Sequence, residues 1–271
     1  MGEYGIRLER EGHLAIVTLD RAERQNTFNE HMLNCLARVI TDLKASLPRA
    51  VIITGSGDKA FCAGFDVNPD NPQISSLVGA VERHEKPPIM AHISRIRTTT
   101  DALVSLPIPV IAAVNGLAYG GGAEIASRCD LRVMDPRAVI CFSEVRLGLM
   151  PDFGGVVGLT RLVGASRAAD LILTARKVDA QEALSLGLVN RISAPGQALA
   201  EAKDLALAVS ENGPRAVRHA LKVIRSIHDM TCAEALELET EEAVSLIASG
   251  ECIHGITAFL SRQKPVFPEP D

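Results

Sequence analysis

Three segments of the chain combine glycines with acidic side chains, the residue types that an active site would need. They cover residues 55–67, 115–130 and 141–155. In the second segment, three glycines precede a helix predicted to begin near Gly121, with Glu124 in its first turn. The first N–H groups of a helix lack intrahelical acceptors and can stabilise an oxyanion, and glycine lets a carbonyl oxygen approach them. Two interpretations stay open: an oxyanion site with a functional acid, or a tight helix start with an ordinary first-turn acid.

The third segment contains two acids whose roles the neighbouring residues leave open. Glu144 follows an apolar run, where its carboxyl group either has a raised pKa beside a site or forms an ion pair with Arg146. The residues alone favour the ion pair. Asp152 follows Pro151 and precedes Gly154 and Gly155. In this position it fits a helix N-cap as well as it fits a functional acid.

The first segment follows a predicted strand and contains Gly55-Ser-Gly-Asp-Lys-Ala, which fits the degenerate dinucleotide pattern G-x-G-x-x-A. A nucleotide-binding helix should open there, but another glycine turn and an acidic, proline-rich stretch follow. We therefore interpret Gly55 and Gly57 as a tight strand exit and expect no nicotinamide cofactor. Gly64 differs, because a glycine beside the aromatic Phe65 can present backbone N–H groups to a ligand.

The elements that must position these segments predict an α/β fold with parallel strand pairing. Strands are predicted at residues 13–20, 50–54, 108–114, 131–133 and 139–142. Apolar residues three or four apart predict a helix over residues 32–43, with Asn29 as its N-cap. Residues 68–88 are polar and punctuated by prolines, which predicts a mobile loop or a short lid helix.

Beyond about Ala165 the pattern predicts helices only. Amphipathic runs cover residues 205–209, 217–227 and 233–247. A helical region attached to an α/β core commonly packs against another part of the assembly, often a second subunit. The basic residues Arg215, Arg218, Lys222 and Arg225 lie near one face of the helix predicted around residues 217–227. A net charge of −5 and 3% aromatic residues favour a solvated basic face over nucleic-acid binding.

Composition excludes further classes of protein. With 47% hydrophobic residues in 271, the chain is predicted to fold into a globular domain with an aliphatic core. Six cysteines without metal-binding spacing are interpreted as reduced and structural, which suits the cytoplasm. The N-terminus lacks the apolar stretch of a signal peptide. Prolines, glycines, Asn115 and Glu124 interrupt the most hydrophobic stretch, so no membrane span is predicted.

Together the three segments resemble the crotonase (enoyl-CoA hydratase/isomerase) superfamily. The matching strings are VIITGSGDKAFCAGFDV, AAVNGLAYGGGAEIASRCDLRV and FSEVRLGLMPDFGGVVGLTRLVG, with weaker matches at RAERQNTFN and GITAFLSRQKPVF. The resemblance implies a spiral core of ββα units with an acyl-CoA site over residues 1–197. It also implies an all-helical region over residues 198–271 that assembles homotrimers, often paired as hexamers. No metal or redox cofactor is implied, and coenzyme A enters as part of the substrate.

The resemblance also implies roles for four residues. Phe65 and Gly121 would provide the two backbone N–H groups that stabilise an enolate. Glu124 and Glu144 stand at the two positions, 20 residues apart, where family hydratases place a glutamate. Glu124 would activate a water molecule and Glu144 would donate a proton to the α-carbon. The implied reaction is the addition of water across the 2,3 double bond of an enoyl-CoA.

Asp152 departs from the typical hydratase pattern, which has glycine directly after the proline of the third segment. In dienoyl-CoA isomerases and some other branches an acid at that position takes part in the chemistry. The alternative is therefore a double-bond isomerase that uses Glu144 with Asp152 or Glu124. A CoA-binding relative without activity is a third possibility, against which the retention of both glutamates argues.

Contacts to coenzyme A are also implied by the resemblance. The residues are Arg24, Ala63, Phe65, Asp66, Val67, Phe259 and Arg262, of which the last two would reach the site of a neighbouring subunit. The family's second basic residue after Arg262 is replaced by Gln263. Residues 68–100 would shape the acyl pocket, and His84 and His92 within them are interpreted as surface or lid residues.

Overall fold

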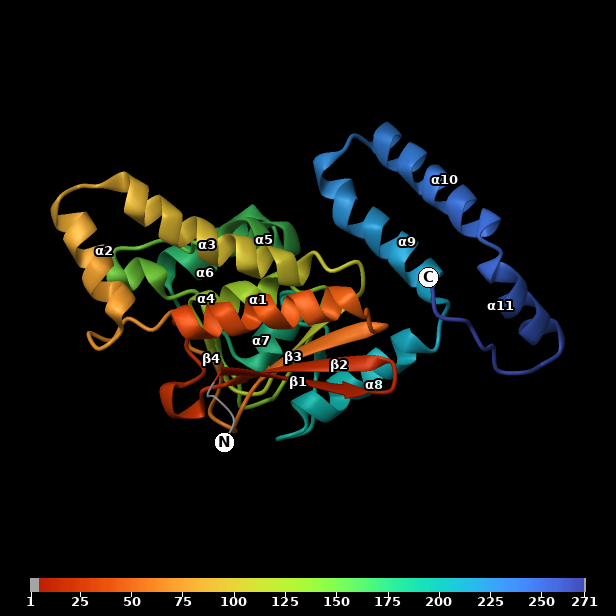
Figure 1. Cartoon of the computed structure of the whole chain (residues 1–271), viewed down its shortest axis with the longest axis horizontal. Coiled ribbons are helices and arrows are strands. Elements are labelled where there is room, and N and C mark those ends of the chain that lie inside the picture. The colour runs from red at the N-terminus through yellow and green to blue at the C-terminus, as the bar shows by residue number, and fades with distance from the viewer. Residues whose placement is uncertain (1–4, 271) are drawn as a thin grey trace.

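The computed structural model describes residues 5–270 and arranges them around two β-sheets (Figure 1). The larger sheet has the order β1-β2-β3-β5-β7-β9, and its neighbours are parallel except β1 and β2. Its strands are β1 (Gly5–Glu11), β2 (Leu14–Asp20), β3 (Ala50–Gly55), β5 (Val110–Val114), β7 (Leu131–Met134) and β9 (Arg191–Ile192). The smaller, parallel sheet contains β4 (Ala60–Cys62), β6 (Leu117–Tyr119) and β8 (Ile140–Cys141).

Successive strands alternate between the two sheets before the chain enters helices. The chain runs from β3 to β4, from β5 to β6 and from β7 to β8, and each pair is followed by one or more helices. The helices are α1 (Glu30–Ala45), α2 (Pro72–Glu82), α3 (Lys86–Val104), α4 (Gly121–Arg128), α5 (Gly155–Val163), α6 (Ala165–Thr174), α7 (Ala180–Ser185), α8 (Ala198–Ser210), α9 (Pro214–Ser226), α10 (Cys232–Ala248) and α11 (Glu251–Leu260). The predicted α/β spiral of ββα units is confirmed.

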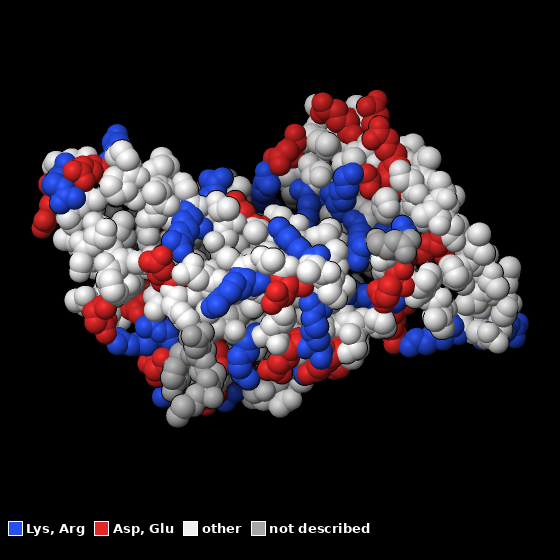
Figure 2. Space-filling model, in the orientation of Figure 1, with Lys and Arg blue, Asp and Glu red and all other residues white. Residues whose placement is uncertain are grey.

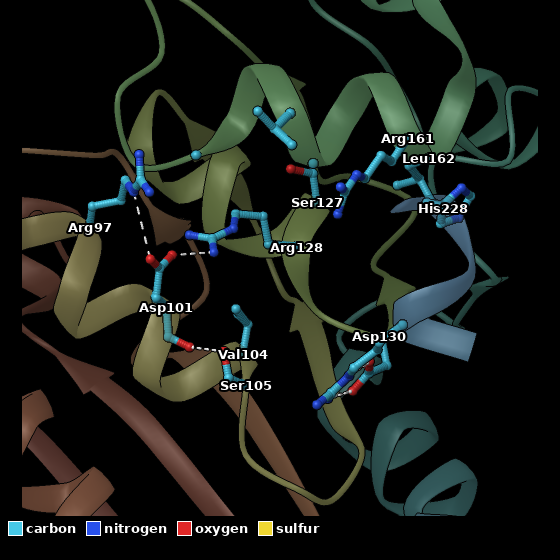
Figure 3. Close-up of a pocket in the computed structure, with 14 residues that line it drawn as sticks. Arg97, Asp101, Val104, Ser105, Ser127, Arg128, Asp130, Arg161, Leu162 and His228 are labelled. Atoms are coloured by element: carbon cyan, nitrogen blue, oxygen red, sulfur yellow. Dashed lines mark hydrogen bonds and ion pairs between the residues drawn. The ribbon is translucent and has the colours of Figure 1, made fainter. Parts of the chain in front are cut away.

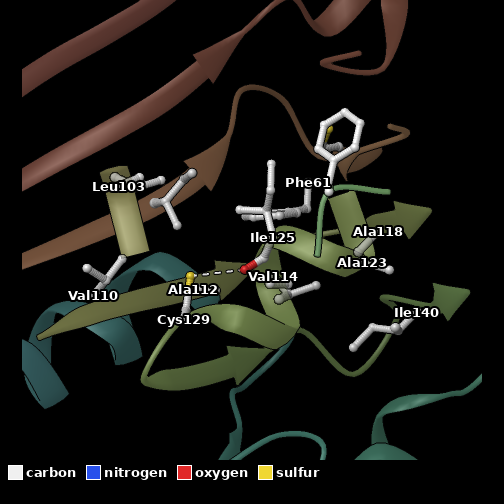
Figure 4. Close-up of a cluster of buried hydrophobic side chains, with 14 of the residues drawn as sticks. Phe61, Leu103, Val110, Ala112, Val114, Ala118, Ala123, Ile125, Cys129 and Ile140 are labelled. Carbon is white, nitrogen blue, oxygen red and sulfur yellow. Dashed lines mark hydrogen bonds between the residues drawn. The ribbon is translucent and has the colours of Figure 1, made fainter. Parts of the chain in front are cut away.

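The inner strands β2, β3 and β5 of the larger sheet are buried on both faces, and their residues are almost all apolar, whereas the edge strand β1 is charged and largely exposed. Alternate residues of β2 belong to different clusters: Ala15, Val17 and Leu19 to the main core, Leu14 and Ile16 to a second one. The second cluster is closed by Ala202 and Ala206 of α8, whose small side chains bring this helix close to the sheet. In the main core, Ile125 of α4 lies among side chains of the sheets and α3 (Figure 4). The helix that carries Glu124 is therefore held inside the core.

The five predicted strands are confirmed as β2, β3, β5, β7 and β8, and Asn29 caps α1 by accepting a hydrogen bond from the Met32 N–H group. The prediction of helices only after Ala165 is wrong, because β9 adds to the edge of the larger sheet beside β7. Two residues are too few for an alternating pattern to reveal. The short strands β4 and β6, and the edge strand β1, were likewise not predicted.

The proline-rich stretch forms two helices where a loop or one short lid helix was expected. Helix α2 lies within the expected stretch, and Asn71 caps it by accepting from the Gln73 N–H group. Helix α3 was missed because Pro87 and Pro88 suggested a break. Both prolines lie in the first turn of α3, where a missing N–H group costs no intrahelical bond.

Helices α9, α10 and α11 project from the core, as the blue end of the chain shows in Figure 1. Arg225 docks α9 through an ion pair with Asp130 and a hydrogen bond to the Leu106 carbonyl oxygen. The chain then returns, and Arg49 donates to the Phe267 carbonyl oxygen and pairs with Glu269. Helix α8 packs on the larger sheet, although the predicted domain division at residue 197 assigns it to the C-terminal region. The division itself stays a prediction.

Three basic residues of α9, Arg218, Lys222 and Arg225, line a hollow between this helix and residues 104–107 of the core. Blue atoms gather between the core and the projecting helices in Figure 2. Several have partners within the chain: Arg225 pairs with Asp130, and Lys222 pairs with Glu242 of α10. These two ion pairs attach α9 to the core and to α10. Among the described residues no single helix has the length and apolarity to cross a membrane, although α10 and α11, bent by 71° at their junction, pass that test as a pair.

Candidate active site

The site is centred on the start of α4, where the first and second glycine segments meet. A Cβ atom on Gly64 would lie 3.0 Å from the Gly121 nitrogen and 3.1 Å from the Tyr119 carbonyl oxygen. Gly64 also has a φ of +93°, a conformation that favours glycine. Two loops more than 50 residues apart in the sequence are thus in backbone contact, which no local pattern could establish.

This contact places the N–H groups of Phe65 and Gly121 in neighbouring loops. Phe28 donates to the Gly64 carbonyl oxygen at 2.7 Å and accepts from the Asp66 N–H group at 2.8 Å. In a parallel bridge of this kind, the N–H group of the central residue, Phe65, points to the opposite side. Gly121 is the first residue of α4, so its N–H group has no intrahelical acceptor. The arrangement suits the predicted oxyanion role, which stays a prediction.

The glycine triplet is required by close packing as well. A Cβ atom on Gly121 would lie 2.8 Å from the Phe153 ring, and one on Gly122 would lie 2.0 Å from the Cys62 carbonyl oxygen. An aromatic ring can shift, but the carbonyl of β4 is part of the backbone. Gly122 therefore sets the distance between α4 and the strand that leads to Gly64.

We expect Gly122→Ala to separate these two loops and destabilise the protein. The new methyl group would force α4 away from β4, with a cost of about 1–3 kcal/mol, as for overpacked core positions. Urea unfolding of the variant measures this loss. Gly187→Ala is the matched control, because Gly187 has no atom within 4 Å of the added Cβ, although its φ of +74° adds some strain of its own. Equal losses in the two variants would contradict the packing argument.

Glu124 is completely buried and is held by the loop before α5. One carboxyl oxygen accepts from the Gly155 N–H group at 2.7 Å, and the other accepts from the Asp152 N–H group at 3.3 Å. A Cβ atom on Gly155 would lie 2.3 Å from Glu124 Cγ, so this side chain requires a glycine opposite it. Glu124 is more than an ordinary first-turn acid of a helix, because it organises a loop about 30 residues away.

Glu144 is also buried, and neither of its carboxyl oxygens has a hydrogen-bond partner among the described residues. The ion pair with Arg146 that the residues alone favoured is therefore wrong. The short 3-10 helix Glu144–Leu147 directs the Arg146 side chain to the surface, while the glutamate faces the start of α4. A Cβ atom on Gly120 would lie 3.5 Å from Glu144 Oε1, which shows how closely the carboxyl group approaches the glycine triplet.

The two carboxyl groups share one buried environment. Burial, and then the neighbouring Glu144, raise the pKa of Glu124 to about 9, whereas the Gly155 N–H group opposes the shift. Burial likewise raises the pKa of Glu144. Two negative charges so close in a buried site repel each other, so the pair retains a proton at neutral pH. The interaction between the two carboxyl groups raises the pKa of Glu124 and lowers that of Glu144. We nevertheless assign the proton to Glu144 on the geometry, because Glu124 accepts from two backbone N–H groups that stabilise its charge and the oxygens of Glu144 have no such donor among the described residues.

Asp152 lies at the same site but is not a helix N-cap. Gly154 occupies the N-cap position of α5, and the Asp152 backbone instead donates to Glu124. Burial, and then the charge of Glu144, raise the pKa of the Asp152 carboxyl group. The structure thus brings together the three acids that the sequence singled out.

Residues 9–270 match the family model described as enoyl-CoA hydratase/isomerase. The chain belongs to this family. It is 37% identical over 264 residues to the short-chain-enoyl-CoA hydratase of Clostridium acetobutylicum, with 95% of each chain covered. It is 33% identical over 268 residues to the crotonyl-CoA hydratase of Syntrophomonas wolfei, covering 98% of this chain and 99% of the relative. The crystal structure of an enoyl-CoA hydratase from Bacillus anthracis superposes with a TM-score of 0.88 at 32% identity, covering 97% and 98% of the two chains.

Members of the enoyl-CoA hydratase/isomerase family act on acyl-CoA substrates, so the predicted coenzyme A contacts can be placed on this structure. The backbone of Ala63 donates to the Gln25 carbonyl oxygen, and Val67 is exposed just after Phe65. Arg24 pairs with Asp70 at 2.6 Å on the surface. Ala63 and Val67 flank Gly64 and Phe65 in the sequence, and the contact of these residues with coenzyme A stays a prediction.

Asp66 has a structural partner that the sequence did not reveal. Its carboxylate pairs with Arg21 at 2.6 Å and accepts from the Asn68 side chain at 2.6 Å. Although burial alone would raise it, the pKa of Asp66 is held below its usual value by hydrogen bonds from Asn68 and Arg21. The side chain of Asp66 thus organises the loop after Phe65. Arg21 is the first residue of the RAERQN turn, which also contains Arg24. Its place in this turn was the sequence feature that could have indicated a role for Arg21.

Phe259 and Arg262 lie at the end of α11, in the part of the chain that projects from the core (Figure 1). Phe259 is 81% exposed. Within one chain the structure does not bring these two residues to the glutamate pair. This placement agrees with their predicted contact with a neighbouring subunit, which stays a prediction.

Two aromatic contacts were missed at the sequence level. The Phe153 ring packs on Gly121, and the Phe65 and His92 rings meet edge to face at 5.0 Å. His92 belongs to α3, so this helix packs against the side chain of Phe65. Within residues 5–270 no three His, Cys, Asp or Glu side chains gather in a way that could hold a metal ion.

Proposed function

We propose that this member of the enoyl-CoA hydratase/isomerase family is a hydratase that adds water across the 2,3 double bond of an enoyl-CoA thioester. The observation that carries the proposal is the asymmetry of the glutamate pair. Glu124 accepts two backbone N–H groups and is suited to a negative charge, whereas the unpartnered Glu144 is suited to hold a proton. One base and one acid beside an oxyanion site are the groups that hydration needs.

In the proposed mechanism the thioester carbonyl oxygen accepts from the N–H groups of Phe65 and Gly121. Glu124 removes a proton from water as the water oxygen bonds to C3, and the electrons of the double bond move onto the thioester as an enolate. Two N–H groups aimed at this oxyanion stabilise it by about 3–4 kcal/mol each, as in other oxyanion holes. Glu144 then delivers its proton to C2. A proton transfer from Glu124 to Glu144 restores the starting state of the pair.

A second candidate function, double-bond isomerisation, is favoured by one specific observation. The Asp152 carboxyl group is partly buried near Glu144, and burial is the main cause of its raised pKa. An acid in this position could take a proton from one carbon of a 3-enoyl-CoA while Glu144 returns a proton to another. No oxygen is added in that reaction, so the two functions differ in their products.

The experiment that separates them is incubation with crotonyl-CoA in H₂¹⁸O, followed by mass spectrometry of the acyl product. The names of the two relatives, a short-chain-enoyl-CoA hydratase and a crotonyl-CoA hydratase, make a short enoyl group the first probe. Labelled 3-hydroxyacyl-CoA that disappears in Glu124→Gln and Glu144→Gln would support hydration. Double-bond migration of a 3-enoyl-CoA without label, abolished by Asp152→Asn, would favour the isomerase instead.

We also propose that the chain assembles as a homotrimer through its projecting helices. Ile253, Ile256 and Leu260 form an exposed apolar stripe on α11. Exposed apolar stripes of this kind typically mark protein–protein contacts. Analytical ultracentrifugation is expected to give the mass of three or six chains, and Ile256→Asp is expected to give monomers. A wild-type monomer at micromolar concentration would exclude this assembly.

A further inference from the structure

Arg128 lies one helical turn after Glu124 on α4 and takes no part in the proposed chemistry. Its side chain is only 16% exposed. We propose that Arg128 is a positioning residue that holds residues 152–155 against Glu124. The inference rests on the proposed function for its kinetic consequence, but the contacts that carry it are independent of the reaction.

The first contact is to the backbone of the loop. Arg128 Nη1 donates to the Phe153 carbonyl oxygen at 2.6 Å. On either side of this carbonyl, the N–H groups of Asp152 and Gly155 donate to Glu124. Two side chains of α4, one helical turn apart, therefore bind the same loop. The carboxyl group of Glu124 accepts from two of its N–H groups, and the guanidinium group of Arg128 donates to one of its carbonyl oxygens.

The second contact is to α3. Arg128 Nη2 pairs with the Asp101 carboxylate, so one guanidinium group joins α3, α4 and the loop (Figure 3). The planar guanidinium has donors that point in several fixed directions, which lets it bridge a carbonyl and a carboxylate at once. A lysine at this position has one nitrogen and would hold the two acceptors less well.

Packing fixes the arginine in this position. A Cβ atom on Gly154 would lie 2.9 Å from Arg128 Nη1, and one on Gly158 would lie 2.7 Å from Arg128 Cγ. Phe153 is thereby held at both ends, with its carbonyl on Arg128 and its ring on Gly121. Loss of Arg128 would release residues 152–155. These residues supply the Asp152 carboxyl group, the two N–H donors to Glu124 and the Phe153 ring that packs on Gly121.

The surroundings of Arg128 provide a matched control. Arg128 lines a cavity of about 530 Å³ together with Arg97, Arg161 and Arg225. Arg97 belongs to α3 and, like Arg128, pairs with Asp101, at 3.6 Å. Its side chain is largely exposed, and no hydrogen bond or ion pair joins it to residues 152–155 in the described part of the chain. The two arginines thus share a partner and a cavity but differ in contact with the loop.

The test compares Arg128→Ala, Arg128→Lys and Arg97→Ala. For crotonyl-CoA hydration we expect Arg128→Ala to lower kcat by about 10- to 100-fold, the effect of a small misplacement of catalytic groups, while KM changes by less than about threefold. Arg128→Lys should recover part of kcat, and Arg97→Ala should match the wild type. A kcat within twofold of wild type in Arg128→Ala, or an equal loss in Arg97→Ala, would overturn the inference.

Amide hydrogen exchange provides a readout that does not need turnover. In Arg128→Ala, or in Arg128→Lys if the alanine variant fails to fold, peptides covering residues 152–155 should exchange at least several-fold faster, with no change in Arg97→Ala. Unchanged exchange would refute the positioning role. If the wild type hydrates no enoyl-CoA, the proposed function fails, whereas the exchange result still decides the role of Arg128.

Discussion

Glu144→Gln is expected to lower kcat for crotonyl-CoA hydration by about 10²- to 10⁴-fold at pH 7, the usual contribution of a positioned general acid. Glutamine keeps the size of the side chain but has no proton to deliver to C2. Because neither oxygen of Glu144 has a hydrogen-bond partner among the described residues, the substitution removes no stabilising bond. The free energy of unfolding should change by less than about 1 kcal/mol. Loss of the enoyl thioester absorbance measures the rate, and urea unfolding measures the stability.

The control for this prediction is Arg146→Gln. Arg146 is the neighbouring residue that the sequence suggested as a partner of Glu144, and the structure places it on the surface. We expect this variant to keep the wild-type kcat. A Glu144→Gln enzyme that retained more than half of its activity would rule out Glu144 as the proton donor, and a loss of several kcal/mol in stability would indicate a structural role instead.

The free energy of unfolding is expected to fall as the pH rises from about 5 to 9. Burial and the neighbouring Glu144 raise the pKa of Glu124 to about 9, above the ordinary value of 4.5, so the coupled pair keeps one proton in the folded state over a pH range in which both glutamates of the unfolded chain are ionised. The stabilising contribution is complete below pH 4.5 and is lost as the pH rises through about 9. Each unit of pKa difference corresponds to about 1.4 kcal/mol, so the loss is on the order of 5 kcal/mol.

Urea unfolding at pH 5.5, 7 and 9 measures this dependence. Glu124→Gln is expected to reduce the slope, because glutamine does not titrate, and to leave a smaller slope, because burial also raises the pKa of Glu144 and of Asp152. Glu251→Gln controls for lost hydrogen bonds, since Glu251 is another buried glutamate that accepts two backbone N–H groups, from Arg215 and Ala216. Asp66 and Asp135 have pKa values held low by hydrogen bonds despite burial, so their contribution is lost only in acid, below this range. An equal slope in wild type and Glu124→Gln would contradict the raised pKa.

The local elements and the residues of the candidate site could largely be predicted from the amino-acid sequence. Asn29 was predicted as the N-cap of α1, and a helix was predicted to begin near Gly121, because capping and helix starts depend on neighbouring residues. The resemblance of three motifs identified the family and both glutamates. Helix α3 was missed, because two prolines fit the first turn of a helix as well as they fit a break.

The tertiary structure alone decided how those residues are used. The sequence left Glu144 with Arg146 as its nearest opposite charge, but the fold turns Arg146 outward and the glutamate inward, beside Glu124. Arg128 showed no sign of a role in the sequence, because its acceptors lie on α3 and on the loop before α5. Burial, charge pairing and backbone contacts arise between segments 20 or more residues apart. Such interactions set the pKa values and positions on which the proposed chemistry depends.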